Sequence, residues 1–167
     1  TKYIVTAPGY RMQYAEHKDY RNETGRKLEI TTQDQESGLQ AVNHFQFFDG
    51  IAVVRCWCEV SNMGKETQTI QYVSTFNLNG VEKEGLLSRD EKIRIGVVHN
   101  SWQRELLLQE YTLPEVGLQN SQVNIPIRSS KAFELTNTGN WSTKHYLPMG
   151  YISNTETGSM LFWQIEH

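Results

Sequence analysis

The sequence predicts an all-β protein, an antiparallel β-sandwich with little or no helix. Three observations support this fold class. Apolar residues alternate with polar ones along short segments, turn-forming Gly, Asn, Asp and Pro residues separate these segments at regular intervals, and no segment keeps the period of an amphipathic helix. About ten short strands of this kind are typical of two packed antiparallel sheets. We expect one such domain over residues 1–167.

The clearest strand pattern lies in residues 51–61 and 66–76, which predict a long antiparallel hairpin. Side chains along each segment alternate with the period of two that a strand imposes. Asn62 and Gly64 in the link tolerate the left-handed backbone of a short turn. One face of the first segment carries Val54, Cys56, Cys58 and Val60, and one face of the second carries Ile70, Tyr72, Ser74 and Phe76.

The segment before this hairpin, residues 39–48, also reads as a strand. Asp49-Gly50 links it to residues 51–61, and Asp-Gly between apolar runs is a strong hairpin signal. The three segments therefore predict an antiparallel meander. Nearer the amino terminus, strands are predicted at residues 3–6 and 26–32, and the polar residues 17–25 predict a loop.

Further strands are predicted in the second half of the chain. Residues 104–111 contain Glu, Leu and Gln, which favour a helix by propensity. We expect a strand there because the segment is short, lacks a cap and lies in an all-β context. The other predictions are a loop or sheet edge at 81–92, strands at 93–99, 131–137 and 159–166, an exposed excursion at 114–128, and an aromatic-rich polar connection between the last two strands.

The overall charge limits the possible partners. A net charge of −3 with scattered Lys and Arg residues gives no concentrated positive surface, so we expect neither a nucleic acid nor an anionic membrane as partner. No apolar run approaches the roughly 20 residues that span a bilayer. The first residues do not read as a signal peptide, which slightly favours a cytoplasmic location and leaves the compartment undecided.

Metal and cofactor motifs are not evident in the sequence. Cys56 and Cys58 lie two apart on one strand face, where a disulfide would need the strand to buckle, so free thiols are expected. A Cys-x-Cys metal clip would lack its remaining ligands nearby. There is no glycine-rich phosphate loop and no Gly-x-Ser-x-Gly elbow. We therefore expect no cofactor and no metal in this chain. Acid/base chemistry by a pair of carboxylates stays formally possible with 19 acidic residues, although solvated surface charges explain them better.

Two polar clusters with aromatic side chains could bind a ligand, and they occupy residues 99–105 and 137–146. Aromatic faces beside amides and hydroxyls suit sugar rings, which stack on the aromatic and hydrogen-bond through their hydroxyls. The alternative is a buried Trp that anchors a loop. The candidate binding residues are Trp141, Lys144, His145, Tyr146 and Trp102.

Four stretches together resemble the amino-terminal β domain of glycoside hydrolase family 36, the α-galactosidases also called melibiases. The resemblance depends on the order and spacing of the stretches. They are residues 37–64, ending in Val60-Ser61-Asn62-Met63-Gly64; Phe76-Asn77-Leu78 with His99-Asn100-Ser101-Trp102-Gln103-Arg104-Glu105; residues 129–148; and residues 158–167.

The resemblance implies a non-catalytic, supersandwich-like domain. In that family a following (β/α)₈ barrel hydrolyses terminal α-galactosyl residues with retention, using an Asp nucleophile and an Asp acid/base. Such a barrel needs roughly 250 residues, so this chain is expected to be an inactive fragment of a larger α-galactosidase. The implied partners are its missing barrel, α-galactosides in the full-length protein, and a further copy in a homo-oligomer.

The resemblance also implies how this domain contributes to the enzyme. In the family, loops of the β domain lean toward the active site and shape substrate access, which favours the loop with Trp141 and Tyr146, followed by Trp102. Two further hypotheses remain open. The chain could be an autonomous carbohydrate-binding module, or a structural sandwich that serves oligomerisation.

Overall fold

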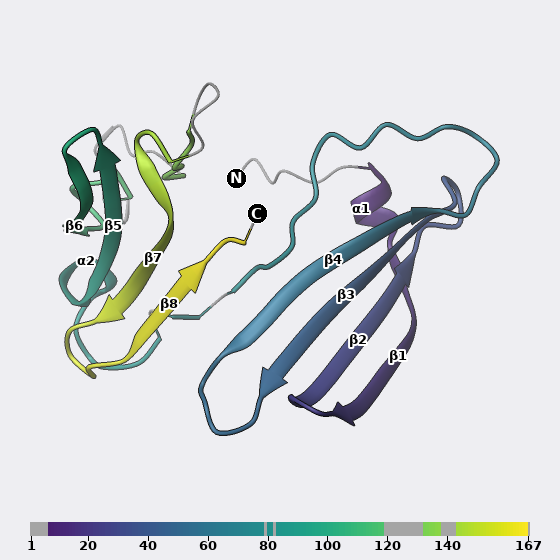
Figure 1. Ribbon diagram of the computed structural model, residues 1–167, viewed down its shortest axis with the longest axis horizontal. Coiled ribbons are helices and arrows are strands. Elements are labelled where there is room, and N and C mark those ends of the chain that lie inside the picture. Colours follow the sequence, from purple (N-terminus) through teal and green to yellow (C-terminus); the bar gives the residue numbers. More distant parts are fainter. Residues whose placement is uncertain (1–6, 79, 82, 119–131, 138–142, 167) are drawn as a thin grey trace. The chain divides into compact units, whose positions relative to one another are not determined.

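The structure is a computed structural model, and it describes residues 7–78, 80–81, 83–118, 132–137 and 143–166. The described residues form eight strands in two antiparallel four-stranded sheets, together with two short helices (Figure 1). The all-β, antiparallel fold class is therefore confirmed, and two such sheets are the strand content of a β-sandwich. The chain divides into two compact units, residues 1–78 and 79–167.

The first unit is an antiparallel meander. After the short helix α1 (Ala7–Arg11), the strands follow one another in the sheet in chain order, as Figure 1 shows. The predicted strands at 26–32 and 39–48 are confirmed, and so is the pairing of the second with the strand after it. The strands are β1 (Gln13–Asn22), β2 (Gly25–Gln33), β3 (Leu39–Phe48) and β4 (Val54–Asn62).

One face of this sheet is apolar, as the alternation predicts. Phe45 of β3 lies opposite Cys56, and Ala41 lies opposite Val60. Both cysteines are free thiols, and burial raises the pKa of each. The link between β3 and β4 is longer than predicted, since it comprises residues 49–53 and not Asp49-Gly50 alone.

The predicted loop at residues 17–25 is wrong, because most of it belongs to β1. This edge strand is exposed along its whole length, so neither of its faces has to be apolar and the usual alternation is missing. Polar cross-strand contacts hold it instead. Tyr20 Oη donates a hydrogen bond to Glu29 Oε1 of β2 at 2.9 Å, and Arg26 pairs with Asp19.

The predicted hairpin between 51–61 and 66–76 is also wrong in its second strand, because residues 66–76 form neither helix nor strand. The turn directs the chain away from β4. The Met63 N–H donates to the carbonyl of Gly38 at 2.8 Å. A Cβ built on Gly38 would lie 2.7 Å from Gly64 Cα, so the two turns pack backbone against backbone. The residues after β4 therefore pack against the turn between β2 and β3 and do not form a tight hairpin turn.

The second unit is a four-stranded sheet with the order β6-β5-β7-β8. The predicted strands at 93–99, 104–111 and 159–166 are confirmed, and residues 104–111 are strand rather than helix. Its core cluster consists of Ile93, Ile95, Val97 and Leu113. The elements are α2 (Arg89–Lys92), β5 (Ile93–Ser101), β6 (Arg104–Thr112), β7 (Tyr146–Asn154) and β8 (Met160–Gln164).

The predicted connection before residue 159 contains strand β7, which sequence reasoning missed. Pro148 and Gly150 are the cause, since both disfavour a central strand. Gly150 is required there, because a Cβ would lie 2.6 Å from the Gly96 carbonyl oxygen and from the Trp163 ring. The predicted strand at 131–137 is wrong for residues 132–137. The predicted strand at 3–6 and residues 119–128 of the excursion lie outside the described residues.

Candidate functional site

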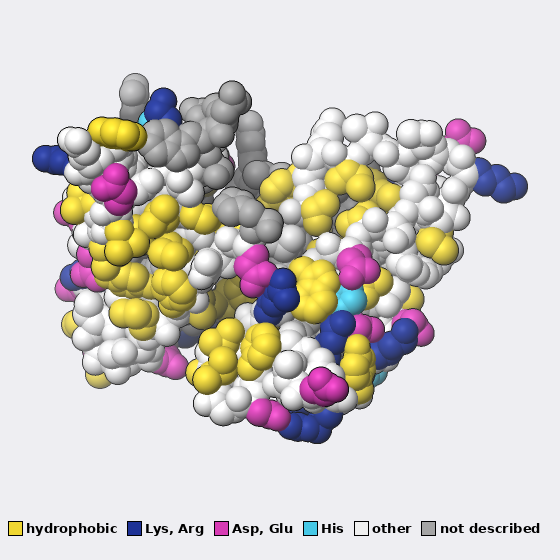
Figure 2. Space-filling view, in the orientation of Figure 1, with side chains coloured by type: hydrophobic (Ala, Val, Ile, Leu, Met, Phe, Trp, Pro, Cys, Tyr) yellow, Lys and Arg dark blue, Asp and Glu magenta, His cyan; other side chains and the backbone are white. Residues whose placement is uncertain are grey.

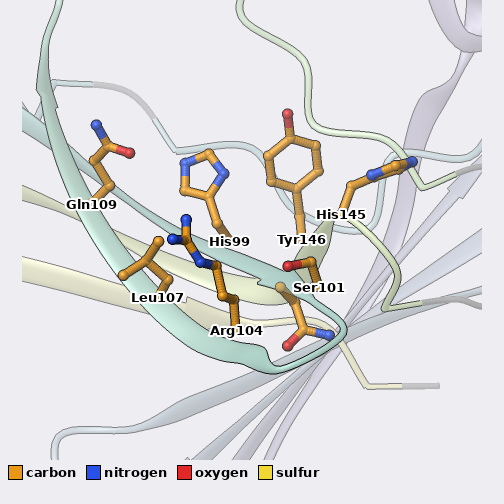
Figure 3. Close-up of a pocket in the computed structure, with 8 residues that line it drawn as sticks. His99, Ser101, Arg104, Leu107, Gln109, His145 and Tyr146 are labelled. Carbon is orange, nitrogen blue, oxygen red and sulfur yellow. The ribbon is translucent and has the colours of Figure 1, made fainter.

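The candidate site is an open pocket of about 310 Å³ on the second unit. It lies where the β5–β6 hairpin meets the start of β7 (Figure 3). Two of the sequence stretches singled out above, residues 99–105 and 137–146, therefore contribute to one site. The pocket is lined by His99, Asn100, Ser101, Arg104, Leu107, Gln109, His145 and Tyr146.

Strand β5 positions His99, the central residue of the pocket. The alternation of side chains along β5 continues beyond the residues of the core cluster. Ile95 and Val97 belong to the core cluster, and His99 is the next residue on the same strand face. The register then sets His99 opposite Leu107 on one side and Tyr146 on the other. The pocket is thus the polar end of an otherwise apolar sheet face.

Two tyrosines fix the imidazole of His99. Its Nε2 lies 2.9 Å from Tyr111 Oη, a hydrogen bond in which donor and acceptor depend on the tautomer. The rings of His99 and Tyr146 lie 5.3 Å apart at 53°. Figure 3 shows His99, Arg104 and Tyr146 projecting to the same side of the ribbon. One edge of the site is therefore aromatic and held in place by its neighbours.

Two asparagines hold the backbone that leads into β7. Asn137 Oδ1 accepts hydrogen bonds from the N–H groups of His145 and Tyr146, both at 3.1 Å, and its Nδ2 donates to the Tyr146 carbonyl at 2.9 Å. Asn100 Nδ2 donates to the Thr143 carbonyl at 2.6 Å. Both amides therefore position the rim of the pocket, a role that sequence reasoning did not assign to them.

A β-bulge shapes the side of the pocket that carries Arg104. The pairing of β5 with β6 shifts register between His99 and Ser101. Leu106 has a φ of 58° and Gln103 a φ of 59°, both in the left-handed region. Such a conformation costs a non-glycine residue about 1–2 kcal/mol. Bulges re-aim side chains and are frequent beside functional sites.

The charge of the lining is basic or neutral, with Arg104 and two histidines and no carboxylate. The neighbouring Glu105 accepts a hydrogen bond from the Gln103 N–H at 3.0 Å and so supports the turn. Within the described part of the chain, no hydrogen bond joins Ser101 to a histidine, and no group of three or more His, Cys, Asp or Glu side chains is placed to hold a metal. The lining offers hydrogen-bond donors and acceptors that could bind hydroxyl groups, and it contains no pair of carboxyl groups.

The predicted binding residues are distributed unevenly around this pocket. His145 and Tyr146 line it, whereas Lys144 is exposed and does not. Trp102 is 77% exposed at the tip of the β5–β6 hairpin and is not part of the lining. Trp141 lies outside the described residues. The sequence analysis named the cluster at residues 99–105 but did not select His99 or Arg104 as binding residues. The alternation along β5 could have identified His99. Nothing in the sequence pointed to Gln109.

A second polar cluster lies on the first unit. Trp57 stacks on His44 with ring centroids 4.6 Å apart, and Lys27 Nζ lies 4.9 Å from the indole. His44 is buried, with Glu29 Oε1 3.4 Å from Nδ1 and Glu59 Oε1 3.2 Å from Nε2. The Lys27 ammonium lowers the pKa of Glu29. Because these groups already contact one another, we interpret the cluster as a structural network.

Comparison of the chain with protein-family models, with curated proteins and with solved structures finds no match. No helix in the described part of the chain is long and apolar enough to span a bilayer.

Proposed function

We propose that this chain is a non-catalytic β domain of an α-galactosidase, a retaining enzyme whose Asp pair lies in a barrel outside this chain. One observation carries the proposal. The stretch at 99–105 and the stretch at 129–148 both belong to the resemblance, and residues of both line the same pocket. A concave site that sets an aromatic side chain beside a few polar groups is typical of ligand binding.

The chemistry of the pocket supports a role in substrate access. The ring of Tyr146 offers a stacking face, while Arg104, Gln109 and Ser101 offer hydrogen bonds to hydroxyl groups. Glycoside hydrolysis needs two carboxyl groups across the scissile bond, and this lining contains none. The domain would therefore shape access to the cleft, stabilise the barrel and contribute subunit contacts.

Activity and binding of the chain by itself test this proposal. We expect no hydrolysis of 4-nitrophenyl α-galactoside and no heat of binding with methyl α-galactoside in calorimetry. The reason is that the pocket supplies one wall of a cleft whose other wall belongs to the barrel. Turnover by the purified chain would refute the proposal, provided that it persists after a second purification step.

A second candidate function, an autonomous carbohydrate-binding module, is favoured by Trp102. A Trp that is 77% exposed beside an aromatic pocket is the arrangement that a sugar-stacking platform needs. This reading predicts binding of methyl α-galactoside by the isolated chain, lost on Trp102→Ala and kept in the matched variant Leu108→Ala.

The third candidate, a structural domain for oligomerisation, is favoured by the apolar edge of the second unit. Leu106, Leu107 and Leu108 of edge strand β6 are 65%, 50% and 55% exposed. Figure 2 shows hydrophobic side chains gathered over the strands of this unit. Apolar surface of this kind is usually covered by another protein surface, which is also the contact that a barrel domain would make.

A further inference from the structure

Residues 66–78 follow β4 as an irregular segment of the first unit, with neither helix nor strand. Its backbone is almost unpaired. The carbonyl of Glu66 accepts a hydrogen bond from Asn62 Nδ2 at 2.8 Å, and that of Phe76 accepts one from Ser74 Oγ at 3.5 Å. Among the described residues, no backbone–backbone hydrogen bond reaches this segment. It therefore offers a row of donors and acceptors of the kind that recruits another strand.

The side chains of this segment have the character of a strand. Ile70, Tyr72 and Phe76 share one face in an extended backbone and are 54%, 66% and 52% exposed. Residues 67–78 contain no charged side chain. Proteins usually protect an unpaired strand with charge, proline or a cover, and residues 67–78 contain neither a charged side chain nor a proline.

The sequence of residues 67–75 is nearly symmetric about Gln71. This symmetry favours the same segment of a second copy as the partner. When two copies of residues 67–75 lie antiparallel with Gln71 opposite Gln71, similar side chains face each other. A two-fold interface needs this self-complementarity, since each copy presents the same patch. The cross-strand pairs are Thr67 with Thr75, Gln68 with Ser74, Thr69 with Val73, Ile70 with Tyr72, and Gln71 with itself.

We propose that residues 67–75 are the interface of a homodimer, in which this segment forms an antiparallel strand pair with the same segment of a second copy. The pairs between Ile70 and Tyr72 join a β-branched and an aromatic side chain, and the Thr pairs join β-branched ones, both favourable combinations. Glu66 would lie opposite Phe76, so no like charges meet. This interface is independent of the pocket and of the α-galactosidase proposal.

Sedimentation velocity over a concentration series tests the dimer. We expect the sedimentation coefficient to rise from the monomer value to the dimer value as protein concentration increases. Ile70→Lys should abolish the rise, because it places a charge beside each copy's Tyr72. The matched control Leu86→Lys makes the same change at a leucine that is 98% exposed outside the segment, and it should leave the rise intact. A monomer at every concentration, or a dimer that survives Ile70→Lys, would overturn the proposal.

Cross-linking tests the register. In a chain with Cys56→Ala and Cys58→Ala, Gln71→Cys places two thiols opposite each other across the axis, within the Cα separation that a disulfide accepts. Oxidised glutathione, which accepts the two electrons, should convert this variant to a covalent dimer. Gln68→Cys alone should stay monomeric on a non-reducing gel, but it should cross-link when mixed with Ser74→Cys. Equal cross-linking of Gln68→Cys and Gln71→Cys would contradict the two-fold axis, and circular dichroism of each variant verifies the fold.

Discussion

Asp34 shows how one buried carboxylate can organise a turn. It is 2% exposed and accepts hydrogen bonds from Arg11 Nε at 2.9 Å and Arg11 Nη2 at 2.8 Å, with a further bond from the Ser37 hydroxyl. The carbonyl of Asp34 accepts from the Gly38 N–H at 2.9 Å. These contacts tie the helix α1 to the turn between β2 and β3, the same turn on which Gly64 packs.

The ion pair predicts a pH dependence of stability. The Arg11 guanidinium and the Ser37 hydroxyl hold the pKa of Asp34 well below its usual range of about 4. A lowered pKa in the folded state stabilises the fold above that usual value, and the contribution is lost as pH falls toward the folded pKa. Asp34→Asn should therefore lower the thermal midpoint by several degrees at pH 7 and by less at pH 3, measured by circular dichroism. An equal loss at both pH values would mean that the charge of Asp34 is irrelevant.

At the scale of elements, strands were predictable where their apolar residues alternate with polar ones or form a short run. β3, β4, β5 and β8 show alternation or apolar runs because a sheet face selects apolar residues at every second position. β1 is exposed along its length, so no such selection acts on it. Residues 66–76 have the alternation of a strand but do not form one in the described structure. Alternation shows only that a segment is able to pair in a sheet, and it does not determine whether a neighbouring strand is available.

The candidate site was predictable in composition and not in geometry. The mixture of aromatic and amide residues pointed to His145 and Tyr146, which do line the pocket. The contact between His99 and Tyr146 depends on the register of β5 against β7. Because Pro148 and Gly150 concealed β7, that register could not be deduced from the sequence.

The bulge in β6 leads to a prediction about strain. Leu106 adopts a φ of 58° although it is 65% exposed, so it loses little apolar burial when it is replaced. Asn accepts the left-handed region more readily than Leu. Leu106→Asn should therefore be more stable than the matched variant Leu108→Asn by about 1 kcal/mol, measured by urea unfolding. Equal stability of the two variants would show that the bulge is not strained at Leu106.

At the scale of the whole molecule, each unit leaves apolar surface open to solvent. In the first unit, Phe47 and Val54 of the apolar sheet face are 40% and 46% exposed. In the second unit, the leucines of β6 are exposed along a sheet edge. Over the visible face, Figure 2 shows charged side chains of both signs scattered without a large patch of one sign. Apolar contact, rather than charge attraction, is thus the interaction that this surface favours.

The pocket leads to a prediction about the complete α-galactosidase that we propose. If Tyr146 forms a wall of the cleft, its ring binds the sugar equally in the ground state and the transition state, because it contacts no reacting atom. Tyr146→Leu should then raise KM for 4-nitrophenyl α-galactoside about tenfold and leave kcat within about twofold, the pattern of lost uniform binding.

Two matched variants distinguish sugar contact from a loss of folding. Tyr146→Phe keeps the ring and should keep KM, because stacking needs the aromatic face and not the hydroxyl. Lys144→Ala changes an exposed neighbour that does not line the pocket, and it should leave both constants unchanged. A fall in kcat for Tyr146→Leu with an unchanged KM would contradict uniform binding of the sugar by this ring, since the loss of an interaction made only in the transition state gives that pattern.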